Sequence, residues 1–412
     1  MTRKNFVRLG VLAIAAALGG ASAQRSESLA GIWDASVVVN GAEVPFRMEI
    51  AGNRSNLKGS FFNGDERVTS TRGRRDGSSI VLEFDQYAAK LEATLADGRL
   101  EGRYDRGSRG VYAFRAKRFT PVPLAEGTVP SIAGLWNVQV KSSKGESAWR
   151  LIVRQAGPEI AATVLRVDGD TGMLTGTYRQ GTFILSHFSG ARPSLFELTP
   201  ARDGTLTVVQ RALQNGPATL VAIRDDDARA AALPQPSDPT RFTSVKDPTE
   251  PLRFSFPDLD GRIVSSSDSR FAGKVVIVSI SGSWCPNCHD EAPFLAELYR
   301  TYRSRGLEIV TLSFEEPEQL QSPTRLRAFI KQYRIEYPVL VAGKPEELNE
   351  KLPQAVNLNS FPTAFFVGRD GLVRGAHAGF PGAASGRFHA EAKAEITRRV
   401  EALLAERART SE

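Results

Sequence analysis

The sequence predicts a multidomain protein in which two antiparallel all-β domains, each a barrel or a sandwich, precede an α/β domain. Three observations lead to this fold class. The chain has 412 residues, which is too long for one ordinary hydrophobic core. The stretch "SLAGIWDASVVVNG" at Ser28 returns as "SIAGLWNVQVKSS" at Ser131, so the first half contains an internal repeat. From about Pro251 short strands give way to strands that alternate with helices.

These patterns divide the chain into five segments. The boundary before the last segment is a polar stretch with four prolines, which is typical of a linker. We expect a signal peptide at residues 1–23, a first β domain at 28–120, a second β domain that repeats the first at 130–224, a linker at 225–250 and an α/β domain at 251–408.

The N-terminus has the features of an export signal. A basic start, "MTRKNFVRLG", is followed by about ten apolar residues and by "ASA" before Gln24. The apolar run is too short to remain as a membrane span, which needs about 20 residues. We therefore expect cleavage after Ala23 and a periplasmic or otherwise exported protein.

Composition excludes some classes of protein. The chain is 41% hydrophobic and 24% charged, as in soluble globular proteins. Its net charge of +7 would fall to +4 once the leader, with its three basic residues, is removed. The basic residues are scattered, so we expect no nucleic-acid partner.

Both β blocks consist of short alternating segments separated by turn residues. The stretch "LEATLADGRLEGRY" predicts a hairpin that turns at Asp97–Gly98. Trp33 and Trp136 occupy matching places in the repeat, and we expect both in the cores of their blocks. A barrel of this size either binds a small ligand or is filled by its own side chains. We expect the filled form.

The last segment predicts a parallel sheet covered by helices. "KVVIVSISG" and "GLEIVTLSF" read as buried strands, "TRLRAFIKQY" as a helix and "TAFFVGRDGLVRGA" as a hairpin. A final helix over about 387–408 would bury one face, made of Phe388, Ala392, Ile396, Val400, Leu403 and Leu404.

The only cysteines of the chain, Cys285 and Cys288, stand in "SWCPNCHDEAP". This C-x-x-C spacing suits a redox dithiol, an attachment site for c-type haem in "CPNCH", or half of a zinc site. A disulfide across four residues constrains the unfolded chain very little, so reactivity explains the pair better than stability. His187, His377 and His389 are far apart in sequence, so we expect no metal. We also expect no cofactor, and we interpret His289 as an exposed helix residue.

The cysteines come where a buried strand ends and a helix begins. Pro286 suits the first helical turn, where its missing N–H costs nothing. Cys285 then lies at the helix N-terminus, where the free N–H groups and the helix dipole favour its thiolate. Cys288 lies one turn further, where it can resolve a mixed disulfide. We expect Pro293 to kink this helix.

Three separated motifs agree in order and spacing with one family. They are the lead-in "FSFPDLDGRIVSSSDSRFAGKVVIVSISGSWC", the run "WCPNC" continued as C-x-x-E-x-P, and "FPTAFFVGRDGLV". Over roughly residues 251–406 the chain resembles the thioredoxin superfamily, and within it the exported thiol–disulfide oxidoreductases of the TlpA and ResA type.

The resemblance implies roles for single residues. Cys285 would be the nucleophile, Cys288 the resolving thiol, and Glu291 the acid that relays a proton. Where many thioredoxins have a buried acid, this chain has Ser279, which leaves Glu291 as the candidate relay. The substrate would contact the residues around the dithiol, namely Trp284, Pro286, Phe361 and Pro362, with Pro362 at the position of the family's cis-proline.

The expected function is thiol–disulfide exchange in an exported protein. The resemblance implies reduction of disulfides in protein partners, with electrons from a membrane redox protein. Three alternatives stay open: a ligand-binding or envelope scaffold protein with an accessory redoxin domain, a peroxide-handling redoxin, and a c-type haem protein. A Thr three residues before the first cysteine would favour the peroxide-handling alternative, but Gly282 occupies this position.

Overall fold

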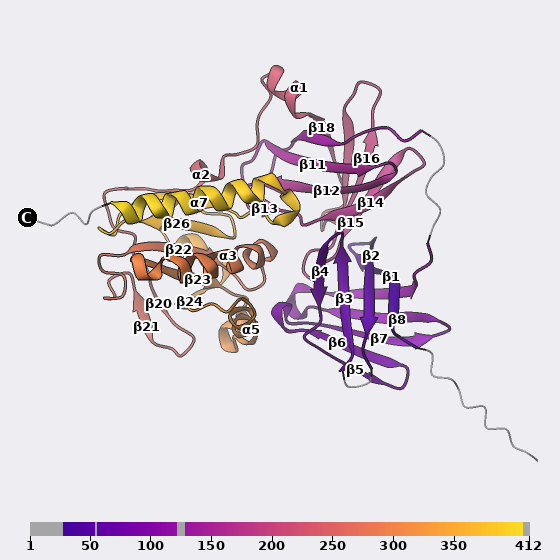
Figure 1. Cartoon of the computed structure of the whole chain (residues 1–412), viewed down its shortest axis with the longest axis horizontal. Coiled ribbons are helices and arrows are strands. Elements are labelled where there is room, and N and C mark those ends of the chain that lie inside the picture. Colours follow the sequence, from indigo (N-terminus) through magenta and orange to yellow (C-terminus); the bar gives the residue numbers. More distant parts are fainter. Residues whose placement is uncertain (1–27, 54–55, 122–127, 407–412) are drawn as a thin grey trace, which may run out of the picture.

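The computed structural model describes residues 28–53, 56–121 and 128–406 as two β domains beside an α/β domain (Figure 1). The expected signal peptide at residues 1–23 lies outside the described residues. Within the described ranges, no helix is both long and apolar enough to cross a membrane.

The first β domain is an open half-barrel. Its antiparallel strands lie in the order β4-β3-β2-β1-β9-β8-β7-β6-β5, and the edge strands β4 and β5 do not pair with each other. The strands are β1 (Gly31–Val39), β2 (Ala42–Ala51), β3 (Lys58–Asn63), β4 (Glu66–Thr69), β5 (Arg72–Asp76), β6 (Ser79–Phe84), β7 (Ala89–Ala96), β8 (Arg99–Asp105) and β9 (Val111–Arg118).

The second β domain is a closed barrel. Its strands lie in the order β11-β10-β18-β17-β16-β15-β14-β12-β13, and β11 also pairs with β12, which closes the sheet on itself. Buried apolar side chains fill its interior, as expected for a scaffold. The strands are β10 (Gly134–Gln139), β11 (Ala148–Ala156), β12 (Glu159–Arg166), β13 (Gly169–Asp170), β14 (Leu174–Arg179), β15 (Thr182–His187), β16 (Ser194–Pro200), β17 (Leu206–Arg211) and β18 (Ala218–Arg224).

The sequence repeat corresponds to a repeat of side-chain contacts. Trp33 donates its indole N–H to the carbonyl of Leu29 at 3.1 Å, and Trp136 donates to the carbonyl of Ile132 at 2.9 Å. An arginine from the last strand of each domain covers the ring, Arg118 in the first domain and Arg224 in the second. Both tryptophans are buried, which confirms the predicted core role.

The predicted hairpin turn is also confirmed. β7 ends at Ala96 and β8 begins at Arg99, so Asp97 and Gly98 alone form the loop. Both have positive φ, 51° and 72°. Two-residue hairpin loops favour this geometry because it matches the twist of the strands.

Phe188 joins the two β domains. It follows β15 of the second domain, yet it lies in the buried core of the first. Its ring is 4.5 Å from that of Phe46 and 5.1 Å from that of Phe61. Its backbone N–H donates to Asn63 Oδ1 at 2.9 Å, and its carbonyl accepts from Asn63 Nδ2 at 3.1 Å. The two β domains therefore share part of one core, which holds the loop after β15 in place.

The expected linker contains short ordered elements. Helix α1 spans Asp225–Ala230, helix α2 spans Pro239–Phe242, and β19 spans Ser244–Val245. Asp238 caps α2 by accepting from the N–H of Thr240 at 2.9 Å, and β19 pairs with β25 (Ala355–Val356) of the α/β domain. The segment therefore packs onto the α/β domain at its end, because β19 adds a strand pair there.

The α/β domain is built on a mixed sheet of five strands. Its order is β24-β23-β22-β26-β27; β22, β23 and β24 are parallel, and β26 and β27 are antiparallel to their neighbours. The strands are β22 (Val275–Ser281), β23 (Leu307–Phe314), β24 (Val339–Gly343), β26 (Thr363–Val367) and β27 (Val373–Ala378), and a separate hairpin pairs β20 (Ser255–Pro257) with β21 (Ile263–Ser265).

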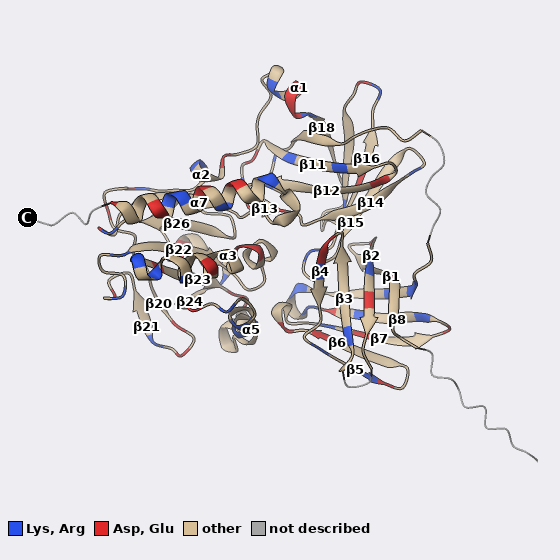
Figure 2. Ribbon diagram, viewed as in Figure 1, with Lys and Arg blue, Asp and Glu red and all other residues tan. Residues whose placement is uncertain are grey.

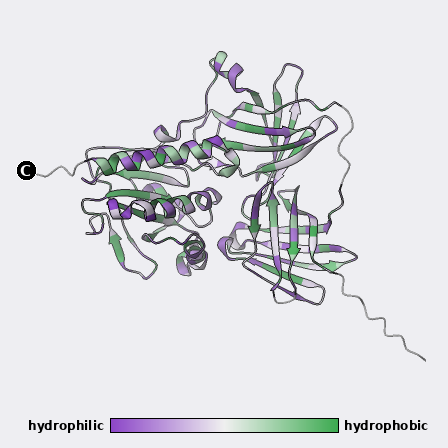
Figure 3. Cartoon of the chain, in the orientation of Figure 1, coloured by the Kyte–Doolittle hydropathy of each residue, from purple (hydrophilic) through white to green (hydrophobic). Residues whose placement is uncertain are grey.

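Apolar side chains cover both faces of this sheet, and Figure 3 shows hydrophobic residues along its strands. One face packs against α3 (Pro286–Tyr302), α5 (Thr324–Tyr333) and α7 (Arg387–Ala405). The other face packs against the β20–β21 hairpin and α6 (Leu348–Lys351), while α4 (Pro317–Gln321) follows β23. A sheet that is buried on both faces needs the continuous apolar strands seen in the sequence.

The last helix follows the prediction closely. Helix α7 buries Ala392, Ile396, Val400 and Leu403, which lie about one turn apart; Phe388 and Leu404 are only half-buried. Figure 2 shows acidic and basic residues interspersed along this helix and over all three domains.

Candidate active site

The two cysteines lie at the junction between β22 and α3. Cys285 is the N-cap residue of α3, with an extended backbone (φ −89°, ψ 117°), and Pro286 occupies the first helical turn. The N–H groups of Cys288 and His289 donate to the Cys285 carbonyl at 3.1 and 3.2 Å. Both cysteines are free thiols. The sequence therefore predicted correctly where the pair lies. Pro293 lies inside α3, which continues through it to Tyr302.

The two sulfur atoms differ in acidity. Burial opposes ionisation of Cys285, but the hydrogen bond with Cys288 and the charge of Arg192 outweigh it, so the pKa of the Cys285 thiol is lowered. Burial, the hydrogen bond with Cys285 and the charge of Cys285 raise the pKa of Cys288 well above its usual value. The surroundings thus favour a thiolate at Cys285 and a thiol at Cys288.

Glu291 is a buried acid and not a surface charge. Its side chain is almost inaccessible, with the residue 3% exposed. Burial raises the pKa of Glu291 to about 8, although the hydrogen bond from Ser279 Oγ to Oε2, at 3.0 Å, partly opposes this rise. Ser279 stands on β22, where the sequence suggested a missing acid, and it hydrogen-bonds the acid on the facing helix. Glu291 also contributes to the raised pKa of Cys288.

The loop before β26 completes the surroundings of Cys285. The Phe361–Pro362 peptide bond is cis, as the resemblance implied. Cys285 Sγ donates to the carbonyl oxygen of Phe361 at 3.4 Å. Trp284 packs edge-on against Phe361, with ring centroids 5.1 Å apart, and donates its indole N–H to the Phe314 carbonyl at 2.8 Å. The predicted contact residues therefore gather around one thiol.

The interpretation of His289 as an exposed helix residue is wrong. The residue is buried, because Tyr87 of the first β domain covers this end of α3, with ring centroids 4.8 Å apart. Its Nδ1 hydrogen-bonds the Tyr333 hydroxyl at 2.8 Å, and its Nε2 hydrogen-bonds the Ser283 carbonyl at 2.9 Å. Burial lowers the pKa of His289 to about 4. Both nitrogens are thus occupied by structural hydrogen bonds.

A buried ionic network supports the loop that carries the cysteines, and the sequence analysis missed it. Glu315 accepts hydrogen bonds from the N–H and the hydroxyl of Ser283, both at 2.7 Å, and from Arg325 at 2.8 Å. Arg325 also pairs with Glu316. The acidic stretch "FEEPEQ" includes the start of α4, and nothing in it indicates that a buried arginine one helix further along pairs with its two adjacent glutamates.

Loops of the second β domain cover the dithiol. Asn287, between the two cysteines, donates from Nδ2 to the Asp168 carbonyl at 2.6 Å. Gly169 forms a parallel bridge with Phe380. Lys144 donates to the carbonyl of Asn359, close to the cis-proline, at 2.7 Å.

The first β domain closes another side of the site. Arg109 lies over the ring of Trp284 at 4.3 Å and pairs with Glu316, and Ser108 donates to Glu318 at 2.5 Å. In this arrangement, Cys285 is only 2% exposed. We call these contacts of Ser108, Arg109, Lys144, Asp168 and Gly169 the cap. Nothing in the sequence pattern pointed to it, because its members stand in loops far from the cysteines.

The comparisons with known proteins each cover a part of the chain. Residues 249–376 match the AhpC/TSA family. The thiol–disulfide oxidoreductase ResA of a Bacillus cereus strain is 31% identical over 120 residues, which make up 29% of this chain and 62% of that protein. The chain thus spans less than two thirds of the length of this curated relative.

Two solved structures are similar to a part of the chain of comparable size. A thioredoxin-family thiol:disulfide interchange protein from Chlorobium tepidum TLS is 29% identical, with a TM-score of 0.30 over 39% of this chain and 100% of its own. StoA from Bacillus subtilis is 21% identical, with a TM-score of 0.26 over 36% of this chain and 97% of its own.

The C-terminal part of this protein is a thioredoxin-like domain that follows two antiparallel β domains. Residues 249–376 within this part match the AhpC/TSA family, and the curated relatives are named thiol–disulfide oxidoreductase ResA.

Proposed function

We propose that this protein is an exported thiol–disulfide oxidoreductase that reduces disulfide bonds of protein partners through Cys285 and Cys288. The observation that carries the proposal is the unequal acidity of the two sulfurs. Cys285, at the N-cap of α3, has a lowered pKa, and Cys288 has a raised one. A nucleophile must be a thiolate when the partner arrives, whereas the resolving thiol must stay protonated until the mixed disulfide has formed.

The reaction has two steps. The Cys285 thiolate attacks one sulfur of the partner disulfide, and the other partner sulfur leaves as a thiolate that takes up a proton. Cys288 then loses its proton and attacks Cys285, which expels the second partner thiol and leaves a disulfide between Cys285 and Cys288. Two electrons pass to the partner.

Glu291 is the proposed proton acceptor for Cys288. A pKa of about 8 leaves a fraction of this carboxyl ionised near neutral pH, and a base with a pKa near the working pH is the most effective. Trp284, Pro286, Phe361 and Pro362 are the proposed contacts for the partner chain, since they surround Cys285.

The remaining parts of the proposal rest on the sequence. The expected leader supports an exported, periplasmic location, and the resemblance supports reduction as the direction, with a membrane redox protein as electron donor. The haem alternative has less support, because both nitrogens of His289 are hydrogen-bonded.

Trapping of mixed disulfides tests the roles of the two cysteines. Cys288→Ser should accumulate partners bound through Cys285, and Cys285→Ser should accumulate almost none. Equal trapping by both variants would refute the assignment. The reduction potential then tests the direction: a reductant should lie below about −200 mV, and an oxidant near about −120 mV.

A further inference from the structure

A cavity of about 800 Å³ lies where the three domains meet. Its wall comes from β4 and the 3₁₀ turn after β6 in the first domain, from the 170–172 and 187–192 segments of the second, and from α3 and α5 of the third. Pro286 and Asn287, the two residues between the cysteines, form part of this wall. Whatever enters the cavity lies against the redox loop.

Four acidic residues line this cavity: Asp85, which pairs with Arg72, and one from each of the three domains, Glu66, Asp170 and Asp290. Asp170 is 1% exposed; its Oδ1 accepts from the N–H of Gly172 at 2.9 Å, and Ser385 and Gly382 lie close enough to lower its pKa, but its Oδ2 has no hydrogen-bond partner among the described residues. Glu66 Oε2 likewise has none there. A buried carboxylate oxygen without a donor is costly, so these atoms indicate a ligand that donates hydrogen bonds.

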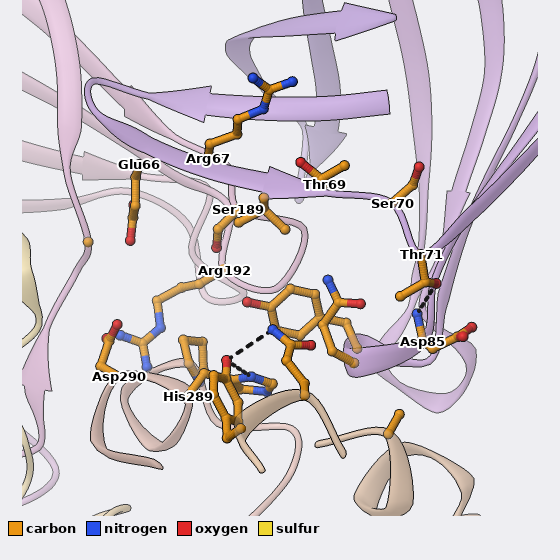
Figure 4. Close-up of a pocket in the computed structure, with 18 of the residues that line it drawn as sticks. Glu66, Arg67, Thr69, Ser70, Thr71, Asp85, Ser189, Arg192, His289 and Asp290 are labelled. Atoms are coloured by element: carbon orange, nitrogen blue, oxygen red, sulfur yellow. Dashed lines mark hydrogen bonds between the residues drawn. The ribbon is translucent and has the colours of Figure 1, made fainter. Parts of the chain in front are cut away.

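Burial raises the pKa values of all three carboxyl groups, and neighbouring carboxyl charges add to the rise at Glu66 and Asp290. Burial and the charge of Asp170 raise the pKa of Glu66 to about 7. Burial, followed by the charges of Asp170 and Glu66, raises the pKa of Asp290 well above its usual value. Arg192 opposes this rise at Asp290, and Figure 4 shows its guanidinium group reaching toward that residue. Arg166, which is buried outside the cavity wall, also interacts with Asp170. Two arginines against three acids leave the cluster short of positive charge.

The other charged groups of the cavity wall do not supply the missing positive charge. Arg67 pairs with Glu49, and Arg72 pairs with Asp85. Lys331 also lines the cavity, but on the surface of α5. Burial lowers the pKa values of both His187 and His289 to about 4, so neither imidazole is charged near neutral pH.

The rest of the wall suits an organic molecule. Tyr87 and Tyr333 contribute aromatic surface, and Gln86 is buried with an Oε1 that has no partner among the described residues. The volume exceeds what a single ion fills and is of the size of small-molecule sites. We propose that the cavity binds a small organic molecule through a primary ammonium group, which donates to Glu66, Asp170 and Asp290.

This proposal is independent of the dithiol reaction, so binding is measured without any redox step. The probes are 1,6-diaminohexane, 6-aminohexanoate and adipate, which share a six-carbon skeleton and differ in charge. We expect titration calorimetry to detect the diamine and the amino acid but not adipate. Binding should release protons at pH 7, because an ammonium group returns the carboxyl groups to their ionised form; heats that differ between phosphate and Tris buffers measure this release.

Variants locate the site. Glu66→Gln and Asp290→Asn should each weaken diamine binding about tenfold or more, as expected for a lost charge-assisted hydrogen bond. Asp97→Asn, in the β7–β8 turn, is the matched control and should leave affinity unchanged. Circular dichroism and thermal unfolding confirm that each variant is folded. If Asp290→Asn fails to fold, Glu66→Gln at the partly exposed rim still decides the question.

Three results would overturn the proposal. Binding of adipate as tight as that of the diamine would exclude recognition of the ammonium group. Diamine affinity equal in wild type, Glu66→Gln and Asp290→Asn would place the probe elsewhere. Displacement of the diamine by Ca²⁺ at lower concentration would make this a metal-ion site. The Cys285→Ser/Cys288→Ser double variant should bind the diamine as wild type does, so failure of the proposed reductase activity would leave this result unaffected.

Discussion

Asn287 donates its side-chain amide to the carbonyl oxygen of Asp168 across a domain boundary, at 2.6 Å. One partner stands between the two cysteines, and the other stands in a loop of the second β domain. The thiol that should react with other proteins is therefore held under a neighbouring domain. A protein disulfide reaches Cys285 only after the cap moves, so the closed arrangement limits access to the thiol.

Loosening the cap should expose Cys285. Arg109→Ala removes the ion pair with Glu316 and the contact with the Trp284 ring. Together these interactions contribute on the order of 1–2 kcal/mol, which corresponds to roughly a fivefold or greater rise in the open population. Alkylation of Cys285 by iodoacetamide, followed by mass spectrometry, measures this rise.

The matched control is Arg103→Ala, which removes an exposed arginine paired with Glu92 in the same domain. Cys285 in this variant should be alkylated at the wild-type rate. Equal rates for Arg109→Ala and wild type would mean that the contact between Arg109 and Trp284 does not limit access.

Removal of the β domains should have a larger effect in the same direction. Two of the hydrophobic clusters lie entirely within residues 245–404, so we expect residues 244–412 to fold alone. Starting at Ser244 keeps β19, which pairs with β25. This fragment should reduce insulin disulfides faster than the full chain does, and its Cys285 should be alkylated faster. A soluble fragment that reacts more slowly would show that the β domains complete the site and do not only cover it.

Glu291→Gln should slow disulfide reduction near neutral pH by ~10²-fold, the usual contribution of a general base. It should also lower the pKa of Cys288, because the charge of Glu291 helps to raise it. In wild type the rate should increase as pH rises toward about 8, the pKa of Glu291, and the variant should lack this increase. Rates and alkylation profiles that coincide for both proteins would remove Glu291 from the mechanism.

The same residue predicts a pH dependence of stability. The pKa of Glu291 is about 8 when folded and near 4.3 in an unfolded chain. The folded state therefore holds the proton of Glu291 more tightly than the unfolded state does. The stability that this proton contributes is complete below about pH 4 and is lost as pH rises to about 8. This loss approaches about 1.4 kcal/mol per pH unit within that window. In urea unfolding at pH 5, 6, 7 and 8, the free energy of unfolding of Glu291→Gln should rise relative to that of wild type as pH increases. A constant difference between the two proteins at all four pH values would contradict this.

Phe188→Ala should destabilise the first β domain although the residue belongs to the second. Deleting a fully buried phenylalanine side chain costs about 3–5 kcal/mol. Ile184→Ala in β15, at a position that is 40% exposed, should cost much less. Hydrogen exchange of the β1–β9 amides separates the two effects, and an unchanged first domain in Phe188→Ala would show that its core does not depend on this ring.

Local features of the fold could be predicted from the sequence, because neighbouring residues determine them. The Asp97–Gly98 turn, the strand before Cys285 and the helix that begins at Pro286 all follow from turn chemistry, apolar runs and the place of a proline. The closure of the second barrel could not be predicted, since it requires the first strand, β10, to pair with the last strand, β18, and no local pattern marks strands that are so far apart in sequence as partners.

The candidate site was predicted only in its inner part. Cys285, Cys288, Glu291 and Pro362 belong to one domain and one family pattern. The partners of His289 come from three places, Ser283, Tyr333 and Tyr87, and only the folded chain brings them together. A helix pattern shows which face is apolar but not that another domain covers a polar residue at its end.

The position of Phe188 has a consequence for folding during synthesis. A chain that is synthesised from its N-terminus delivers β1–β9 before the segment after β15. The first domain cannot complete its core until residue 188 has emerged, because that core includes a ring encoded about seventy residues beyond β9. The early strands must therefore wait, exposed at their open edge, for a later part of the same chain.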